Sequence, residues 1–118
     1  KLNYGQQQAI MSGGINHLLR PAVTNQDFPA RLLRDSNAAN QAMSLYGPLC
    51  TALDCLGEHQ LPSDLNEHDW LVFSQCGAYG FTESMLYFLC HELAGEYVIH
   101  HGEINCIRQA EGASHYLR

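Results

Sequence analysis

Three short motifs hold the side chains that are best suited to chemistry. Cys50 follows a Gly47-Pro48 turn, and a thiol on such a loop can serve as an acid, a nucleophile or a ligand. Tyr79 lies in a Gly-Ala-Tyr-Gly run, where its hydroxyl can donate to a phosphate or a carboxylate. Arg20 precedes a proline, and its planar guanidinium can clamp a carboxylate. Taken singly, each residue has a structural alternative: a buried loop cysteine, a core tyrosine at a turn and a surface ion pair.

The elements expected around these motifs are short strands separated by turns. Strands are predicted where apolar, aromatic and β-branched residues run up to glycine or proline signals. They cover residues 8–12, 28–34 and 69–73, and a hairpin is predicted with arms at 96–100 and 103–108 around His101-Gly102. Segments 35–40 and 61–68 are predicted to be loops, and segment 41–46 leads into the Gly47-Pro48 turn. This pattern predicts a mostly β fold, a small β-barrel or sandwich.

Helices are expected to be few and short. Residues 82–93 are predicted to form a helix with Thr82 as its cap and Glu83 in its first turn. A terminal helix is predicted at residues 111–117, and a single helical turn at 16–19, closed by Pro21. The fold class is therefore mostly β with one or two short helices.

Length and composition indicate one soluble globular domain. The chain has 118 residues, of which 46% are apolar and 15% charged, as in ordinary globular domains. The net charge of −6 argues against nucleic acid and against an anionic membrane surface, because both attract basic proteins. No apolar run approaches the length of a membrane span, and the start lacks the apolar region of a secretory signal. Neither nucleic acid nor a membrane is expected as a partner.

The five cysteines and seven histidines do not suggest a disulfide framework or a metal site. An odd number of cysteines without a C-x-x-C pair suits a reducing, cytoplasmic setting. Most of these cysteines are expected to be small apolar core residues. No histidines stand in an H-x-x-x-H pair, so no metal site is expected.

The three motifs, in this order and spacing, resemble the C-terminal part of the fold-type III pyridoxal-phosphate-dependent decarboxylases, the family of the ornithine and diaminopimelate decarboxylases. Gly47-Pro48-x-Cys50 followed by Asp54 resembles the family's Gly-Pro-x-Cys signature, and segment 65–79 resembles its strand followed by Gly-Ala-Tyr. Residues 16–22, Asn-His-Leu-Leu-Arg-Pro-Ala, are similar to Asn-Asp-Leu-Ile-Arg-Pro-Ala of the diaminopimelate branch. The resemblance spans about residues 8–108.

This resemblance implies a composite active site. In the family, a (β/α)8 barrel carries pyridoxal phosphate as a Schiff base on a lysine. The single lysine here is Lys1, so residues 1–118 are expected to be the C-terminal β-domain of a longer chain whose N-terminal barrel domain and homodimer partner complete the site. The resemblance further implies that Cys50 handles the proton at the substrate Cα, Tyr79 binds the cofactor phosphate and Arg20 holds a substrate carboxylate. The isolated chain is expected to be inactive and, with its interfaces exposed, to self-associate.

Two positions depart from the family pattern and bear on the small-molecule amino-acid substrate. Thr51 stands where the family usually has an acid that meets a distal ammonium, and Thr24 stands where the diaminopimelate branch has a tyrosine. A neutral Thr51 beside a retained Arg20 favours a substrate with an anionic tail. Citryl conjugates of serine or diaminopropionate, intermediates of carboxylate siderophores, have this shape. Segment 77–84 is also similar to decarboxylases of such siderophore pathways.

Three other interpretations stay open at the level of sequence. The chain could belong to a diaminopimelate- or ornithine-type decarboxylase with an altered specificity residue at Thr51. It could belong to a non-catalytic homologue that binds a decarboxylase subunit and regulates it. It could also be an independent small β-barrel binding module, in which case the motif matches are accidental.

Overall fold

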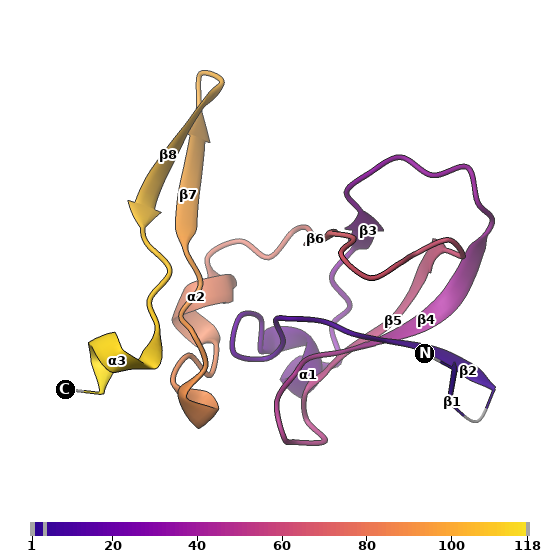
Figure 1. Ribbon diagram of the computed structural model, residues 1–118, viewed down its shortest axis with the longest axis horizontal. Helices are drawn as coiled ribbons and strands as arrows, with labels where there is room; N and C mark the ends of the chain where they lie inside the picture. The colour runs from indigo at the N-terminus through magenta and orange to yellow at the C-terminus, as the bar shows by residue number, and fades with distance from the viewer. Residues whose placement is uncertain (1, 4, 118) are drawn as a thin grey trace.

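The structure, a computed structural model, describes residues 2–3 and 5–117 of the chain. Lys1, the single lysine of the chain, lies outside the described residues. The main sheet has the strand order β1-β2-β4-β5 (Figure 1). Its strands are β1 (Leu2–Asn3), β2 (Gln6–Ile10), β4 (Asn40–Tyr46) and β5 (Cys55–Pro62). Strand β2 runs antiparallel to β1 and parallel to β4, and β4 runs antiparallel to β5.

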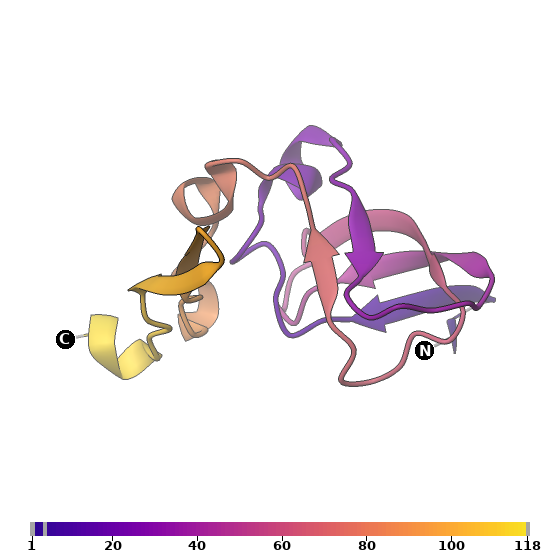
Figure 2. The same cartoon turned by 90° about the horizontal axis from the view of Figure 1, so that it is seen from above.

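Two antiparallel ribbons accompany the main sheet. Strand β3 (Ala30–Leu32) pairs with β6 (Leu71–Phe73), and β7 (Glu96–His100) pairs with β8 (Glu103–Arg108). Figures 1 and 2 show the β7–β8 hairpin standing apart from the four-stranded sheet. The predicted hairpin and the mostly β fold class are confirmed. Among the described strands the sheets stay open, so the sandwich alternative fits better than a closed barrel.

Strands β4 and β5 supply four of the six residues of the buried apolar cluster, and most of these residues face one side of the sheet. Met43 and Leu45 of β4 are buried, as is Leu61 of β5. Leu56 is buried too, although a separation of five residues from Leu61 would put it on the opposite face of a regular strand. The β4–β5 register shifts by one residue at this end, where Gly57 has a φ of 90°. This bulge turns Leu56 back toward the core.

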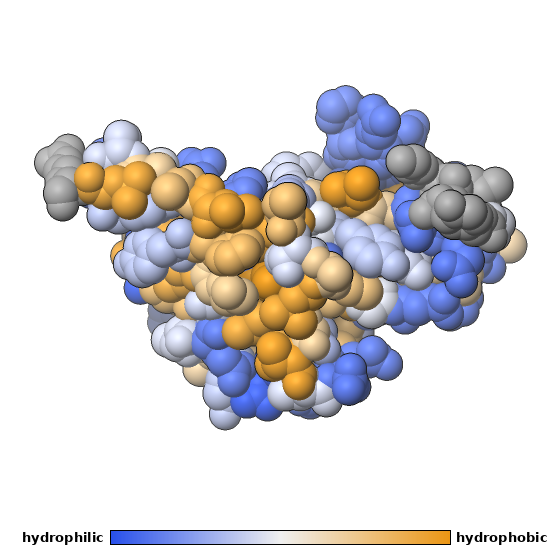
Figure 3. Space-filling model, turned by 90° about the horizontal axis from the view of Figure 1, so that it is seen from below, coloured by the Kyte–Doolittle hydropathy of each residue, from blue (hydrophilic) through white to orange (hydrophobic). Residues whose placement is uncertain are grey.

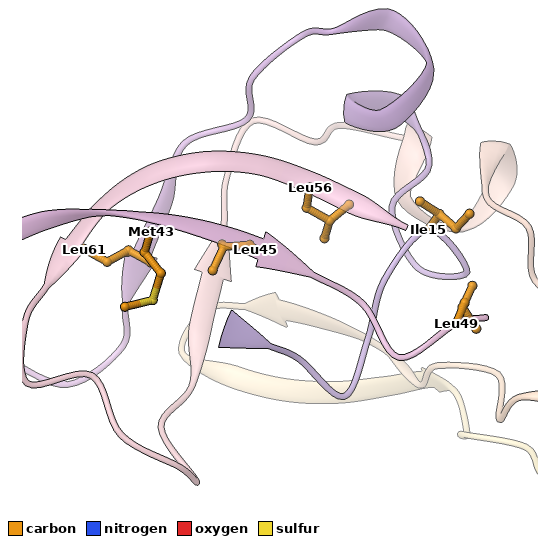
Figure 4. Close-up of a cluster of buried hydrophobic side chains, with 6 residues drawn as sticks. All are labelled: Ile15, Met43, Leu45, Leu49, Leu56 and Leu61. Carbon is orange, nitrogen blue, oxygen red and sulfur yellow. The ribbon is translucent and has the colours of Figure 1, made fainter. Parts of the chain in front are cut away.

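Two loops add one buried residue each to this core. Ile15 comes from the segment between β2 and α1, and Leu49 comes from the segment between β4 and β5. Figure 4 shows both beside the leucine and methionine side chains of β4 and β5. Burial of such a side chain stabilises a fold by roughly 1.5–3 kcal/mol. The loops that carry the Arg20 and Cys50 motifs are therefore anchored in the core.

The helical elements are single turns. They are α1 (Arg20–Thr24), α2 (Tyr79–Glu83), the 3-10 turn η1 (Phe88–Cys90) and α3 (Ala113–Tyr116). The terminal helix is confirmed by α3. The helical turn predicted at 16–19 lies slightly earlier, where the N–H of Leu18 donates to the carbonyl of Gly14 at 3.0 Å. The prediction that Pro21 closes this turn is wrong, because α1 begins at Arg20. Pro21 lies in its first turn, where a missing backbone N–H costs nothing and the fixed φ favours the helix.

The prediction of a helix at 82–93 is also wrong. The backbone is extended at Ser84, with φ −83° and ψ 163°, and Leu89 and Cys90 have positive φ. Thr82 lies inside α2, where its hydroxyl donates to the carbonyl of Ala78 at 2.7 Å instead of capping a helix. Residues between α2 and η1 pack against the core, among them Met85, so tertiary contacts rather than helical periodicity set this segment.

The prediction that most cysteines belong to the core is wrong as well. Cys50, Cys90 and Cys106 are exposed, and Cys55 and Cys76 are only partly buried. All five are free thiols. The exposed ones lie on turns or on the β7–β8 hairpin, so nothing in the described part of the chain covers them.

The hairpin presents one apolar face to solvent. Ile99 pairs with Ile104 and Tyr97 pairs with Cys106, so these four side chains share a face, and all four are exposed. Figure 3 looks at the molecule from below, away from the tip of the hairpin in Figure 1, and shows further apolar residues gathered on that side. No helix in the described residues has the length and apolar character that a membrane crossing requires.

Candidate functional site

The loop that presents Cys50 is held by one buried carboxylate, that of Asp54. Its side chain is 2% exposed. Oδ2 accepts a hydrogen bond from the backbone N–H of Leu49 at 2.7 Å, and Oδ1 accepts one from Ile15 at 2.8 Å. The carbonyl of Asp54 accepts a third from the N–H of Gly47 at 3.0 Å. Asp54 therefore fixes its own turn and ties it to the loop that precedes Arg20.

Glycine is required where these two loops meet Asp54. A Cβ on Gly14 would stand 2.1 Å from Oδ1 of Asp54, and a Cβ on Gly47 would stand 2.3 Å from the same atom. Both distances are far below van der Waals contact. Asn16, which is also buried, accepts a hydrogen bond from the N–H of Gly14 at 3.1 Å. The glycines of the two motifs thus serve the packing of the carboxylate.

The turn leaves Cys50 at the surface. Its thiol is exposed and forms no hydrogen bond within the described residues, so it is free to meet a group from outside this domain. Thr51 is half-buried, and its Oγ1 accepts a hydrogen bond from the N–H of Leu53 at 3.2 Å. The hydroxyl of Thr51 thus shapes the turn and brings no charge to this position.

Arg20 and Tyr79 meet directly, together with a third residue that the sequence did not single out for the site. Nε of Arg20 donates to Oε2 of Glu83 at 2.9 Å, and Nη2 donates to Oε1 at 3.2 Å. Cζ of Arg20 lies 4.1 Å from the centroid of the Tyr79 ring, a cation–π contact. Because Tyr79 and Glu83 are four residues apart on α2, they lie on one face of the helix. That i, i+4 spacing is the signal that could have identified Glu83.

Helix α2 is attached to the Arg20 segment by its own C-terminal end. The N–H of Leu19 donates to Oγ of Ser84 at 3.3 Å, and the N–H of Met85 donates to the carbonyl of Ile15 at 3.1 Å. The backbone of Ile15 therefore bonds Asp54 on one side and Met85 on the other. Residues 14–20 connect all three sequence motifs, although Cys50 itself contacts neither Arg20 nor Tyr79 through a hydrogen bond.

Arg20 forms an ion pair with Glu83, as the structural alternative for this residue predicted. Side-on pairing with Glu83 uses two of the five guanidinium N–H groups and leaves three, on Nη1 and Nη2. No described residue accepts a hydrogen bond from these three. The ion pair and a carboxylate-binding role are therefore compatible.

A broad apolar groove of about 730 Å³ lies beside this assembly, between the end of β2 and β6. Its lining includes Ile10, Trp70, Leu71 and Cys76. Burial raises the pKa of the Cys76 thiol above its ordinary value. Ile10 and Trp70 are exposed large apolar side chains, so this groove is a further surface that the described residues leave uncovered.

The loop at the edge of this groove is held by Arg34. Its guanidinium binds both carboxylate oxygens of Asp69, at 2.7 and 2.8 Å, and Oδ2 of Asp64 at 3.2 Å. Hydrogen bonds from Arg34 lower the pKa of Asp69 below its ordinary value. The pKa of Asp64 is lowered mainly by a hydrogen bond from Ser36 and to a smaller extent by Arg34.

Within the described residues, no group of three or more histidine, cysteine or acidic side chains could hold a metal ion.

The donors present suit the phosphate end of pyridoxal phosphate. Tyr79 is exposed, and its hydroxyl has no hydrogen-bond partner among the described residues, so it can donate to a phosphate oxygen. The guanidinium of Arg20 stacks on the ring of the same tyrosine, with Cζ 4.1 Å from the ring centroid. No lysine occurs among the described residues, so none of them can hold the cofactor as a Schiff base.

Comparisons with known proteins agree with these features. The family profile described as "Pyridoxal-dependent decarboxylase, C-terminal sheet domain" matches residues 1–77. The diaminopimelate decarboxylase of Vibrio cholerae is 33% identical over 106 residues, which are 90% of this chain and 25% of that protein. The L-glutamyl-(BtrI acyl-carrier protein) decarboxylase of Niallia circulans is 28% identical over 117 residues, 92% of this chain and 27% of that protein. The chain thus spans about a quarter of the length of these relatives.

Solved structures share the fold. A crystal structure of diaminopimelate decarboxylase superposes with a TM-score of 0.90 at 24% identity, covering 99% of this chain and 30% of that chain. The enzyme from Helicobacter pylori complexed with L-lysine has a TM-score of 0.84 at 22% identity, covering 96% and 28%. The predicted resemblance and its cofactor class are confirmed at the level of the family. The chain belongs to the pyridoxal-dependent decarboxylases, of which it forms the C-terminal sheet domain.

Proposed function

We propose that the longer protein containing this chain is a cytoplasmic carboxy-lyase that removes carbon dioxide from an amino acid with the help of pyridoxal phosphate. The observation that carries the proposal is the meeting of Arg20 and Tyr79, with the Cys50 turn tied to the same segment through Asp54. The exposed groups of these residues are those that the fold does not use for its own packing.

Each of the three residues has one task in this proposal. Pyridoxal phosphate, when bound, supplies the electron sink for the pair that carbon dioxide leaves at Cα. The hydroxyl of Tyr79 donates a hydrogen bond to the cofactor phosphate, and the thiol of Cys50 delivers a proton to Cα after carbon dioxide has left. Arg20 binds a carboxylate at the far end of the substrate through the N–H groups that Glu83 leaves unused.

The substrate we propose is an amino acid with an anionic tail, such as a citryl conjugate of serine or diaminopropionate made for a siderophore. Thr51 supports this choice, because it is neutral and its hydroxyl already accepts the N–H of Leu53. A distal ammonium would find no carboxylate at this position.

Diaminopimelate is a second candidate, because its far end carries both a carboxylate and an ammonium. The specific observation in its favour is Glu83, whose carboxylate lies beside Arg20 and could receive the ammonium that Thr51 cannot. Several relatives with this domain are diaminopimelate decarboxylases.

The experiment uses the full-length protein loaded with pyridoxal phosphate and measures carbon dioxide release. The panel contains citryl-serine, citryl-diaminopropionate, diaminopimelate, ornithine, lysine and arginine. Turnover of a citryl conjugate alone supports the anionic tail, and turnover of diaminopimelate alone supports the second candidate. Absence of turnover across the panel, with the cofactor bound, would favour the non-catalytic regulatory homologue.

We also propose that the apolar face of the hairpin packs on the N-terminal barrel domain of the same chain, with a homodimer partner completing the site. Tyr97, Ile99 and Ile104 are exposed in this domain alone, and an uncovered apolar face of this kind marks an interface. Hydrogen exchange of the 96–108 amides in the full-length protein tests this, because a packed hairpin exchanges far more slowly than an isolated one. Equal exchange in the domain and in the full-length protein would contradict it.

A further inference from the structure

We propose that Glu83 is a positioning residue for Arg20: it holds the guanidinium side-on, so that the end-on edge is the one left for the distal carboxylate of the substrate. This inference rests on the proposed carboxylate-binding role of Arg20. It assigns a function to a residue that the Cys50, Tyr79 and Arg20 motifs do not include.

The pairing geometry determines which edge of Arg20 is available. Glu83 takes the N–H of Nε and one N–H of Nη2, at 2.9 and 3.2 Å. Of the three remaining N–H groups, one on Nη1 and one on Nη2 form the end-on edge of the guanidinium, and the second N–H of Nη1 points to the Cδ side. This edge matches the two oxygens of a second carboxylate. A substrate carboxylate can therefore bind without displacing Glu83.

Tyr79 completes the hold on the guanidinium. Its ring lies under Cζ of Arg20 at 4.1 Å, while Glu83 binds one edge. Because both residues belong to one face of α2, a single helical turn fixes the plane and the rotation of the guanidinium. The side chains of Arg20 and Glu83 are only 25% and 34% exposed, so the pair is better shielded than an ordinary surface ion pair.

Neutralisation by Glu83 changes how an anion is recognised. The Arg20–Glu83 pair has no net charge, so a bound carboxylate is held by two directed hydrogen bonds rather than by excess positive charge. Removing the charge of Glu83 has two opposite effects: it leaves a net cation, and it frees the guanidinium to rotate away. Our proposal is that the loss of position dominates, because the end-on edge then no longer stays in one orientation.

The test is Glu83→Gln in the full-length protein loaded with pyridoxal phosphate. Glutamine keeps the shape but loses the charge and one of the two acceptor oxygens. We expect the KM for citryl-serine to rise roughly tenfold, the equivalent of one charge-assisted hydrogen bond, with kcat within about twofold because the tail is remote from Cα. The double variant R20K/E83Q should be no worse than R20K alone, since lysine has no fork to position.

Glu96→Gln is the matched control. Glu96 pairs with Arg108 at 3.1 Å, with side-chain exposures of 32% and 38%, and Arg108 is stacked on the ring of Phe81 at 3.4 Å. The chemistry of this arginine–glutamate–aromatic cluster is the same, but no role in substrate binding is proposed for it. We expect the KM for citryl-serine to be unchanged in this variant, and equal unfolding temperatures of the two variants exclude a general loss of structure.

A second readout needs no turnover. Isothermal titration of the same proteins with citrate, as a probe of the tail site, should give a Kd at least about fivefold weaker for Glu83→Gln than for the wild type. A KM or Kd that is unchanged or lower in Glu83→Gln would overturn the positioning role while leaving the proposed function intact. If the wild-type protein neither turns over the citryl conjugates nor binds citrate, the proposed anionic-tail function itself is refuted.

Discussion

Replacing Asp54 by asparagine tests the central anchor of the site. The wild-type carboxylate accepts the N–H groups of Leu49 and Ile15, one on each oxygen. Asparagine keeps the size of the side chain but turns one acceptor into an NH2 donor. Whichever way the amide is oriented, one of the two buried N–H groups then faces another donor. The substitution therefore removes a hydrogen bond without making a cavity.

The expected loss follows from the burial of Asp54, which is 2% exposed. One charge-assisted hydrogen bond disappears, the other becomes neutral, and a buried N–H is left unsatisfied, which together cost about 3 kcal/mol. With about 2.1 cal/mol/K of unfolding entropy per residue, this lowers the Tm of the domain by about 12 °C. In urea, the midpoint should fall by about 2 M. The whole stability of a domain of this size is only about 5–15 kcal/mol, so the variant should be marginal.

The assay is urea and thermal unfolding of the 118-residue chain, followed by circular dichroism and by the fluorescence of its single tryptophan, Trp70. Asp35→Asn is the control, because Asp35 is exposed and its side chain forms no hydrogen bond among the described residues. Native-state hydrogen exchange adds a local readout: protection of the Leu49 and Ile15 amides should fall more than protection elsewhere. A midpoint of Asp54→Asn equal to that of the control would refute the anchoring role.

Three further predictions concern other parts of the chain. With iodoacetamide at pH 8, Cys50 should be alkylated before Cys76, because Cys50 is exposed whereas burial raises the pKa of Cys76; mass spectrometry of partly labelled protein shows the order. Asp69→Asn should lower the urea midpoint at pH 7, because the ion pair with Arg34 stabilises the folded protein only while Asp69 is ionised. Hydrogen bonds from Arg34 hold the folded-state pKa of Asp69 below its ordinary value, so the difference from wild type should shrink as the pH falls below 3.8. Urea titrations from pH 7 to 3 measure this difference. Ile99→Lys should reduce self-association of the isolated chain, because it puts a charge on the exposed apolar face of the hairpin. Sedimentation velocity of both proteins at equal concentration measures this, and identical sedimentation-coefficient distributions would contradict it.

Local signals predicted some of the elements because their causes are local. The β7–β8 hairpin has apolar arms on either side of His101-Gly102, and both residues have the positive φ that such a tight turn needs. The clustering of aromatic and β-branched residues before Gly77 likewise located β6. The arms and the turn of the hairpin all lie within residues 96–108, so no distant contact had to be known.

Other elements depend on contacts that a single sequence does not reveal. Strand β5 was missed because Gly57, Glu58, His59 and Gln60 interrupt its apolar residues, and only the pairing with β4 and the bulge at Gly57 make the segment a strand. The same holds for the helix expected at 82–93. The N–H of Met85 bonds the carbonyl of Ile15, seventy positions earlier in the chain, and this contact ends the helical pattern. Tertiary structure overrides propensity in both cases.

The candidate site was predicted in its residues but not in its connections. Arg20, Cys50 and Tyr79 were found by motif, while Glu83 was read as a first-turn helix residue because the helix was expected to begin at Thr82. The actual start at Tyr79 puts Glu83 four residues along the same face. An error of three residues in a helix start therefore hid the partner of Arg20.

The structure separates the residues that the fold needs from those that the chemistry would need. Gly14, Gly47 and Asp54 are explained by packing alone, because the carboxylate fills the space that two Cβ atoms would occupy. A non-catalytic homologue would have to keep these three in order to fold. The free thiol of Cys50 and the hydroxyl of Tyr79 satisfy no need of the described domain, since neither forms a hydrogen bond within it. Their presence, rather than that of the glycines or the buried aspartate, is what favours an active decarboxylase over a regulatory subunit.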